Sequence, residues 1–175
     1  MKIIQAQTAD EMETVRALFR EYERFLKVDL CFQGFAEELA TLPGRYAPPQ
    51  GRLLLAREGE QTAGCVALRP LDDGVCEMKR LFVRPDYRGR GLGRLLALRA
   101  VSEAMASGYA VMRLDTLETL DGAMRLYTSL GFRRRPPYYA NSLPGVVYWE
   151  RALSDLPLAA VEPDDPPPGP IGATP

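Results

Sequence analysis

Arginine and glycine alternate within one short stretch of the chain: Arg88, Gly89, Arg90, Gly91, Leu92, Gly93 and Arg94. Glycines let a backbone approach a ligand closely, and the free amides at the start of a helix carry a partial positive charge. Arginine side chains add charge-assisted hydrogen bonds to the same anion. The combination predicts a seat for a pyrophosphate group where a helix begins.

The spacing of these glycines argues against two other phosphate-binding motifs. A Gly-x-Gly-x-x-Gly dinucleotide fingerprint would need glycine at position 94 or 96, where Arg94 and Leu96 stand. A Walker motif ends in Gly-Lys-Ser or Gly-Lys-Thr, and neither tripeptide occurs in the chain. A tight strand-to-helix turn with solvated arginines is the remaining alternative.

The residue types that the chain lacks narrow its chemistry further. Its 175 residues include no histidine, which removes Ser-His-Asp and Cys-His arrangements and every imidazole metal site. Three cysteines are widely spaced without a Cys-x-x-Cys pair, and Cys65 and Cys76 lie among apolar neighbours, as inert buried thiols do. We therefore expect catalysis by carboxylate, tyrosine or backbone groups, no metal, and a reducing, cytoplasmic setting.

The balance of charge argues against a nucleic-acid partner. Lys and Arg number 22 and Asp and Glu 23, for a formal net charge of -1, so no overall basic field exists. No stretch approaches the roughly 20 apolar residues that cross a bilayer, and the first residues do not read as a signal peptide. We expect neither a nucleic acid nor a membrane as partner.

The order of secondary-structure elements follows from hydrophobic periodicity. Strands are expected over 2–7, 53–56, 65–68, 75–83, 111–116, 132–135 and 146–151, and helices over 8–27, 35–41, 90–107 and 120–130. Thr8 and Glu11 have the spacing of a capping box at the start of the first helix.

This order predicts one α/β (α+β) domain over residues 1–151, with helices on both faces of a mixed sheet. The proline-rich residues 152–175 cannot bury enough apolar surface to repay ordering, and we expect a flexible tail there.

Two separated motifs then occur in a defined order. Arg88, Gly91 and Gly93 fit the pattern Arg/Gln-x-x-Gly-x-Gly/Ala, directly after a predicted strand. Residues 123–132, Ala-Met-Arg-Leu-Tyr-Thr-Ser-Leu-Gly-Phe, fit the pattern Ala-x-x-Leu-Tyr-x-x-Leu-Gly-Phe. Over roughly residues 2–151 the chain thereby resembles the GNAT superfamily of acetyltransferases, and within it small bacterial members whose acceptors are mostly unassigned. The resemblance implies a mostly antiparallel central sheet of about six to seven strands.

The resemblance also implies a site for acetyl-coenzyme A. Backbone groups of Leu81, Phe82 and Val83 would pair with the pantetheine arm, where their strand splays from its parallel neighbour. Amides from Arg88 to Arg94 would hold the pyrophosphate. Many members carry Asn seven residues before the motif tyrosine, whereas this chain has Leu120, so a contact to the cofactor or to a catalytic water would be absent or replaced.

Direct transfer from a thioester needs a neutral amine, and a lysine-like amine with a pKa of about 10.4 is mostly protonated at neutral pH. Glu77 is the candidate base; its side chain alternates with Met78, so the strand register decides whether it faces the cleft, and a strand carboxylate paired with arginine is the alternative. By resemblance, Tyr127 would protonate the departing thiolate; a packing aromatic is the alternative. The amide of Leu81 or Phe82 would polarise the thioester carbonyl.

The acceptor side is expected to include Phe32, Gln33 and Tyr139. Three adjacent arginines at 133–135 would favour an acidic acceptor, although such a run is more often a solvated surface. The sequence thus predicts an acetyl-CoA-dependent N-acetyltransferase acting on an amine of a small molecule or peptide. A catalytically weak acyl-CoA-binding regulatory module is the alternative function, and a nucleic-acid binder is a weaker one. A homodimer is expected from the resemblance alone.

Overall fold

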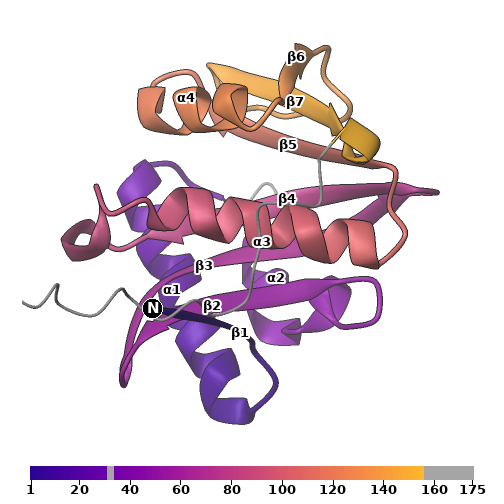
Figure 1. Ribbon diagram of the computed structural model, residues 1–175. Helices are drawn as coiled ribbons and strands as arrows, with labels where there is room; N and C mark the ends of the chain where they lie inside the picture. Colours follow the sequence, from indigo (N-terminus) through magenta and orange to yellow (C-terminus); the bar gives the residue numbers. More distant parts are fainter. Residues whose placement is uncertain (31–33, 156–175) are drawn as a thin grey trace, which may run out of the picture.

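Within the described residues, 1–30 and 34–155, a seven-stranded sheet forms the centre of the protein, in the order β1-β2-β3-β4-β5-β7-β6 (Figure 1). In this computed structural model the strands are β1 (Lys2–Gln5), β2 (Arg52–Glu58), β3 (Gln61–Asp72), β4 (Val75–Val83), β5 (Val111–Leu117), β6 (Arg133–Arg135) and β7 (Val146–Ala152). Neighbouring strands pair antiparallel except β4 and β5, which are parallel. The expected mixed, mostly antiparallel sheet is confirmed.

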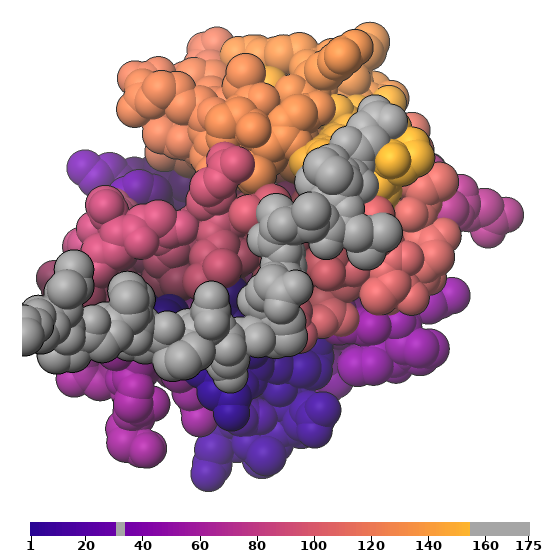
Figure 2. Space-filling view, viewed as in Figure 1, coloured from indigo at the N-terminus to yellow at the C-terminus, as the bar shows by residue number. Residues whose placement is uncertain are grey.

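Helices cover both faces of this sheet, as expected. They are α1 (Ala9–Leu26), α2 (Phe35–Thr41), α3 (Leu92–Ala106) and α4 (Asp121–Ser129). In Figure 1, α3 lies in front of the sheet and α1 and α2 lie behind it. Figure 2 shows the same side as a surface, on which the orange side chains of α4 and the strands around it gather above those of α3.

Two hydrophobic layers follow from the alternation of side chains along β2. Leu53 and Leu55 pack with Phe19 of α1, whereas Leu54 packs with Leu96 of α3. Because successive side chains of a strand point to opposite faces, this run of leucines gives the sheet an apolar surface on each side. Each surface is then buried by its own helices.

The start of α1 is the predicted capping box. The Thr8 side chain accepts from the Glu11 amide at 3.2 Å, and the Glu11 carboxylate accepts from the Thr8 amide at 3.0 Å. The helix predicted from residue 90 begins instead at Leu92, because Gly91 precedes it with a φ of 77°, which helical residues do not adopt. The chain therefore turns sharply just before α3.

The folded part of the chain extends beyond the predicted boundary at residue 151. Ala152 belongs to β7, and Leu153 is buried with its amide donating to the Ala110 carbonyl at 2.8 Å. The remainder of the predicted tail, 156–175, lies outside the described residues. No helix in the described ranges combines the length and the apolar character needed to cross a membrane.

Candidate functional site

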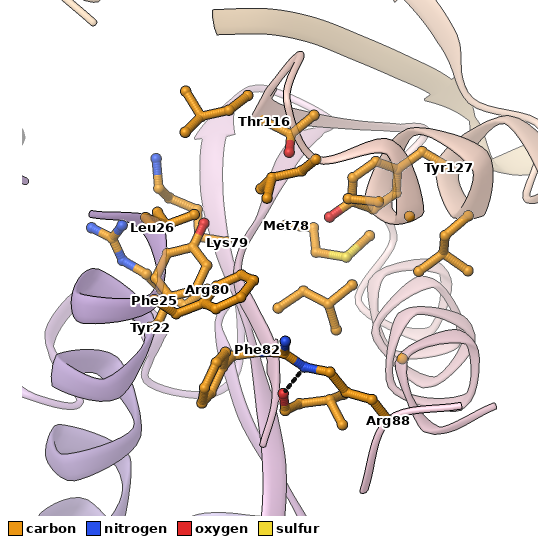
Figure 3. Close-up of a pocket in the computed structure, with 18 of the residues that line it drawn as sticks. Tyr22, Phe25, Leu26, Met78, Lys79, Arg80, Phe82, Arg88, Thr116 and Tyr127 are labelled. Carbon is orange, nitrogen blue, oxygen red and sulfur yellow. Dashed lines mark hydrogen bonds between the residues drawn. The ribbon is translucent and has the colours of Figure 1, made fainter. Parts of the chain in front are cut away.

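β4 and β5 pair only at their beginnings and then diverge. Their parallel ladder joins Val75 to Val111, Cys76 to Met112 and Glu77 to Arg113, and no further pair follows. A cavity of about 490 Å³ occupies the gap beyond, walled by α1, the second half of β4, the loop before α3, the end of β5 and α4 (Figure 3). The splay inferred from the family resemblance is present.

A β-bulge at Arg80 shapes the β4 side of this cavity. Arg80 has a φ of 57°, and the pairing of β4 with β3 shifts register around it. Its buried guanidinium donates to Glu38, with Nη2 2.6 Å from Oε2 and Nε 3.0 Å from Oε1. Tyr46 donates to the same carboxylate at 2.7 Å. A bulge bends a strand, so this buried ion pair helps to fix where β4 leaves β5.

Beyond the bulge, part of the β4 backbone faces the cavity. The Arg84 amide donates to the Ala63 carbonyl of β3 at 2.9 Å. Antiparallel bonding alternates along a strand, so Phe82 also directs its backbone to β3, while Leu81 and Val83 direct theirs toward the cavity. All three predicted residues line the cavity.

The loop before α3 presents a row of unused amides. The six consecutive amides of residues 89–94 donate to no group in the described part of the chain, and the first helical bond of α3 runs from Leu95 to Gly91. The Arg88 amide is not among them, because it donates to the Pro85 carbonyl at 3.1 Å. Free amides at a helix start attract an anion.

The arginines of this loop do not act alike. Arg88 donates from Nε to the Val83 carbonyl at 2.9 Å, and its guanidinium lies 4.2 Å from the ring centre of Phe25 (Figure 3). Arg94 lines the cavity and donates to the Ser129 hydroxyl at 2.9 Å. Arg90 turns toward Glu58 at 3.6 Å and does not line the cavity.

Tyr127 reaches the cavity from α4. Its ring packs on Phe132 and Trp149, and its hydroxyl points into the cavity toward Met78 (Figure 3). Burial raises the pKa of this hydroxyl well above its ordinary value. The hydroxyl is therefore protonated at neutral pH. Within residues 1–30 and 34–155 it has no hydrogen-bond partner, so it is available to a ligand.

Glu77, the predicted base, does not line the cavity. Its fully buried carboxylate accepts from Arg69 and from the Tyr138 hydroxyl, each at 2.7 Å. Burial opposes its ionisation, but the charges of Lys79 and Arg69 hold its pKa below the usual value. These contacts favour the alternative interpretation of Glu77, a strand carboxylate paired with an arginine.

A different carboxylate stands at the divergence. Asp115 of β5 lines the cavity and lies 3.4 Å from Lys79 Nζ on β4. Asp115 was not among the residues predicted from the sequence, although an acid two residues from Arg113 in a largely apolar strand is a usable signal. The described residues contain no cluster of His, Cys, Asp or Glu that could hold a metal ion.

The profile of the acetyltransferase (GNAT) family matches residues 12–132, which is more than half of the chain. The protein belongs to the GNAT family. An uncharacterized N-acetyltransferase of Schizosaccharomyces pombe is 44% identical over 146 residues, covering 82% of this chain and 90% of the relative. One from Dictyostelium discoideum is 31% identical over 202 residues, covering 81% and 93%. Both relatives are named N-acetyltransferases, which supports acyltransferase activity for this protein.

Solved GNAT structures share the fold. An acetyltransferase of the family from Staphylococcus aureus superposes with a TM-score of 0.73 at 20% identity, covering 87% of this chain and 98% of that one. An acetyltransferase from Salmonella typhimurium, solved with its cofactor acetyl-CoA, gives 0.65 at 22% identity, covering 94% and 98%.

The residues predicted for the acceptor side, and Leu120, differ in their relation to the cavity. Phe32 and Gln33 lie outside the described residues. Tyr139 does not line the cavity; its ring centre lies 5.7 Å from Lys79 Nζ, and its side chain is hydrogen-bonded to Asp115. Leu120 lines the cavity just before α4, so an apolar side chain occupies the place where many GNAT proteins have Asn.

The three arginines of β6 lie away from the cavity wall. Arg134 packs over the ring of Trp149, with 5.1 Å to its centre, and Arg135 pairs with Glu150 at 2.5 Å. Arg133 is exposed. This arrangement favours the surface interpretation of the run over a role in selecting an acidic acceptor.

The thiols Cys65 and Cys76 are buried and free. Burial raises the pKa of each to about 12, so neither supplies a thiolate at neutral pH. A covalent acyl-cysteine route therefore has no activated nucleophile among these two residues.

Proposed function

We propose that this protein transfers the acetyl group of acetyl-CoA directly to an amine of a small molecule or peptide. One observation carries the proposal: a single cavity joins the unused amides of residues 89 and 91–94, the edge of β4 that pairs with no strand, and the Tyr127 hydroxyl. The amides suit a pyrophosphate, and the backbone of Leu81 and the amide of Val83 suit the amide groups of a pantetheine arm, since the Val83 carbonyl already accepts from Arg88. The Salmonella protein of the same fold, which holds acetyl-CoA, supports this assignment.

The chemistry then follows from what each group can do. A thioester lying at the divergence of β4 and β5 would have its carbonyl near backbone amides of β4, which stabilise oxygen charge as the amine attacks. Tyr127 would donate its proton to the departing sulfur, since its hydroxyl is protonated and points into the cavity. In this mechanism the protein positions the two substrates and transfers protons, and no covalent intermediate forms on it.

A binding module that holds acyl-CoA without turnover is the second candidate. Leu120, in place of the Asn of many members, favours it, because one polar group of the cavity is missing. The free, protonated hydroxyl of Tyr127 favours the enzyme. Release of coenzyme A thiol in the presence of amines distinguishes the two functions.

We also propose that the protein is cytoplasmic and that it forms a homodimer. The free buried thiols fit a reducing compartment. The homodimer rests on the family resemblance, and light scattering of the purified protein measures it directly.

Calorimetric titration with acetyl-CoA tests the cofactor. We expect micromolar binding of acetyl-CoA and of free coenzyme A, and none of NADH. Absence of acetyl-CoA binding would contradict the proposed function, and the loop before α3 would then be only a structural turn.

Gly93→Val should weaken acetyl-CoA binding at least about tenfold, equivalent to about 1.4 kcal/mol. A Cβ at this position would lie 3.8 Å from Leu126 and 3.9 Å from Val83, in ordinary contact, so the empty protein accommodates it. The two added methyl groups would extend into the space between β4 and α4 where the pantetheine arm must pass. Titration of the variant measures the loss.

Leu95→Ala is the matched control, because Leu95 belongs to the same helix, is 43% exposed and does not line the cavity. Both variants should keep melting temperatures near that of the parent. Equal affinity of Gly93→Val and Leu95→Ala for acetyl-CoA would contradict the path proposed for the arm.

A further inference from the structure

Asp115 is the one acidic residue among the described residues that line the cavity. It follows the last paired residue of β5, Arg113, by two positions, just as Lys79 follows Glu77 on β4. Asp115 and Lys79 therefore face each other where the strands begin to diverge, at 3.4 Å. The Asp115 side chain is 14% exposed, whereas that of Glu77 is wholly buried.

The face of the sheet on which Asp115 lies follows from alternation along β5. Met112 and Leu114 belong to the core beneath α3. Successive side chains point to opposite faces, so Asp115 lies on the face covered by α1. Tyr127 belongs to the core on the other face. The carboxylate and the phenol thus flank the divergence from opposite sides of the sheet.

The part of the cavity on the α1 face is open to a second ligand. Tyr22, Phe25 and Leu26 of α1 form its outer wall, opposite Lys79 and Arg80 of β4 (Figure 3). The amides that suit the pyrophosphate and the wall of α4 belong to the other part. An acceptor can therefore approach from α1 while acetyl-CoA occupies the α3 and α4 side.

The charged groups on this face leave Asp115 as the carboxylate presented to the acceptor. Arg80 is paired with Glu38 at 2.6 Å, and the Glu77 carboxylate is occupied by Arg69 at 2.7 Å. Lys79 and a hydrogen bond with Tyr139, which itself lies outside the cavity wall, hold Asp115 in place. A carboxylate fixed from behind and opening on a cavity suits an ammonium group.

We propose that Asp115 receives the ammonium group of a compact, apolar primary amine and takes its proton. This inference rests on the proposed acetyl transfer. One proton passes from the ammonium to the Asp115 carboxylate, directly or through water, and later leaves to solvent. The nitrogen lone pair then forms a C–N bond with the thioester carbonyl carbon, the C–S bond breaks with its electron pair on sulfur, and the second proton lost from nitrogen ends on sulfur through Tyr127.

Two amines of similar shape test the role of Asp115. Benzylamine is protonated at neutral pH, whereas O-benzylhydroxylamine is uncharged and needs no base before it attacks. Asp115→Asn should lower turnover of benzylamine about 100-fold or more, the usual contribution of a general base, and that of O-benzylhydroxylamine less than about tenfold. Thiol release measures both rates, and calorimetry should give the parent affinity for acetyl-CoA.

Asp72→Asn serves as the control, because this carboxylate is 69% exposed at the end of β3 and does not line the cavity. Equal losses with the two amines in Asp115→Asn would show a structural role and overturn the inference. The inference is also overturned if the parent protein binds acetyl-CoA but does not acetylate both amines. Failure to bind acetyl-CoA at all counts against the proposed function instead.

Discussion

Tyr127→Phe is expected to lower turnover about 100-fold, within the range for loss of a general acid, while leaving acetyl-CoA affinity nearly unchanged. The substitution removes one oxygen that has no hydrogen-bond partner within the described residues and keeps the ring packed on Phe132 and Trp149. Only the proton that we propose for the departing sulfur is lost. Thiol release with the best amine found by screening gives the rate, and calorimetry gives the affinity.

The pH profile adds a second measurement for this tyrosine. Burial raises the pKa of Tyr127, so its hydroxyl stays protonated through about pH 10, the ordinary pKa of tyrosine. Loss of the acid form should therefore not lower the rate of the parent protein as pH rises toward that value.

Tyr109→Phe is the matched control. The Tyr109 hydroxyl donates to the Gln50 carbonyl at 3.0 Å, and the residue does not line the cavity. Its turnover should stay near that of the parent. If Tyr127→Phe weakened affinity and turnover equally, the phenol would serve binding or packing rather than proton transfer.

The sequence predicted those parts of the fold that depend on neighbouring residues. The bounds of α2 match the expectation of 35–41, and the capping box places the start of α1. Gly91 directly precedes α3 with a φ of 77°, a conformation that glycine adopts readily. Each of these features is fixed by local geometry, so a single sequence is enough to reveal it.

The base could not be predicted in the same way, because its position depends on contacts between distant residues. Which face Glu77 occupies depends on the register of β4 with β5 and on Tyr138, which lies 61 residues further along the chain. The bulge at Arg80 is held by Glu38, which lies 42 residues away. A bulge inserts one residue and reverses the alternation beyond it, so counting along the strand fails there. Two consecutive cations, Lys79 and Arg80, within a buried strand were the available signal.

Glu38→Ala is expected to lower the free energy of unfolding by about 3–5 kcal/mol, the usual cost of removing one partner of a buried ion pair. Arg80 is 5% exposed and would keep its charge without the carboxylate that now accepts two of its hydrogen bonds. Burial opposes the ionisation of Glu38, but Arg80 holds its pKa below the ordinary value. A lowered pKa in the folded state means that the stabilisation is full above about pH 4.3, the ordinary glutamate value, and is lost as pH falls below it.

Urea denaturation at neutral and at acid pH measures this loss, and the difference between parent and Glu38→Ala should shrink in acid. Glu37→Ala is the control, because this neighbour on α2 is exposed. Its free energy of unfolding should differ from that of the parent by no more than about 0.5 kcal/mol. Replacing Arg80 by Met in addition to Glu38→Ala also removes the buried positive charge, so the double variant should be more stable than the single one. A double variant no more stable than Glu38→Ala would mean that the cost comes from lost packing of α2, and the bulge would then not depend on the ion pair.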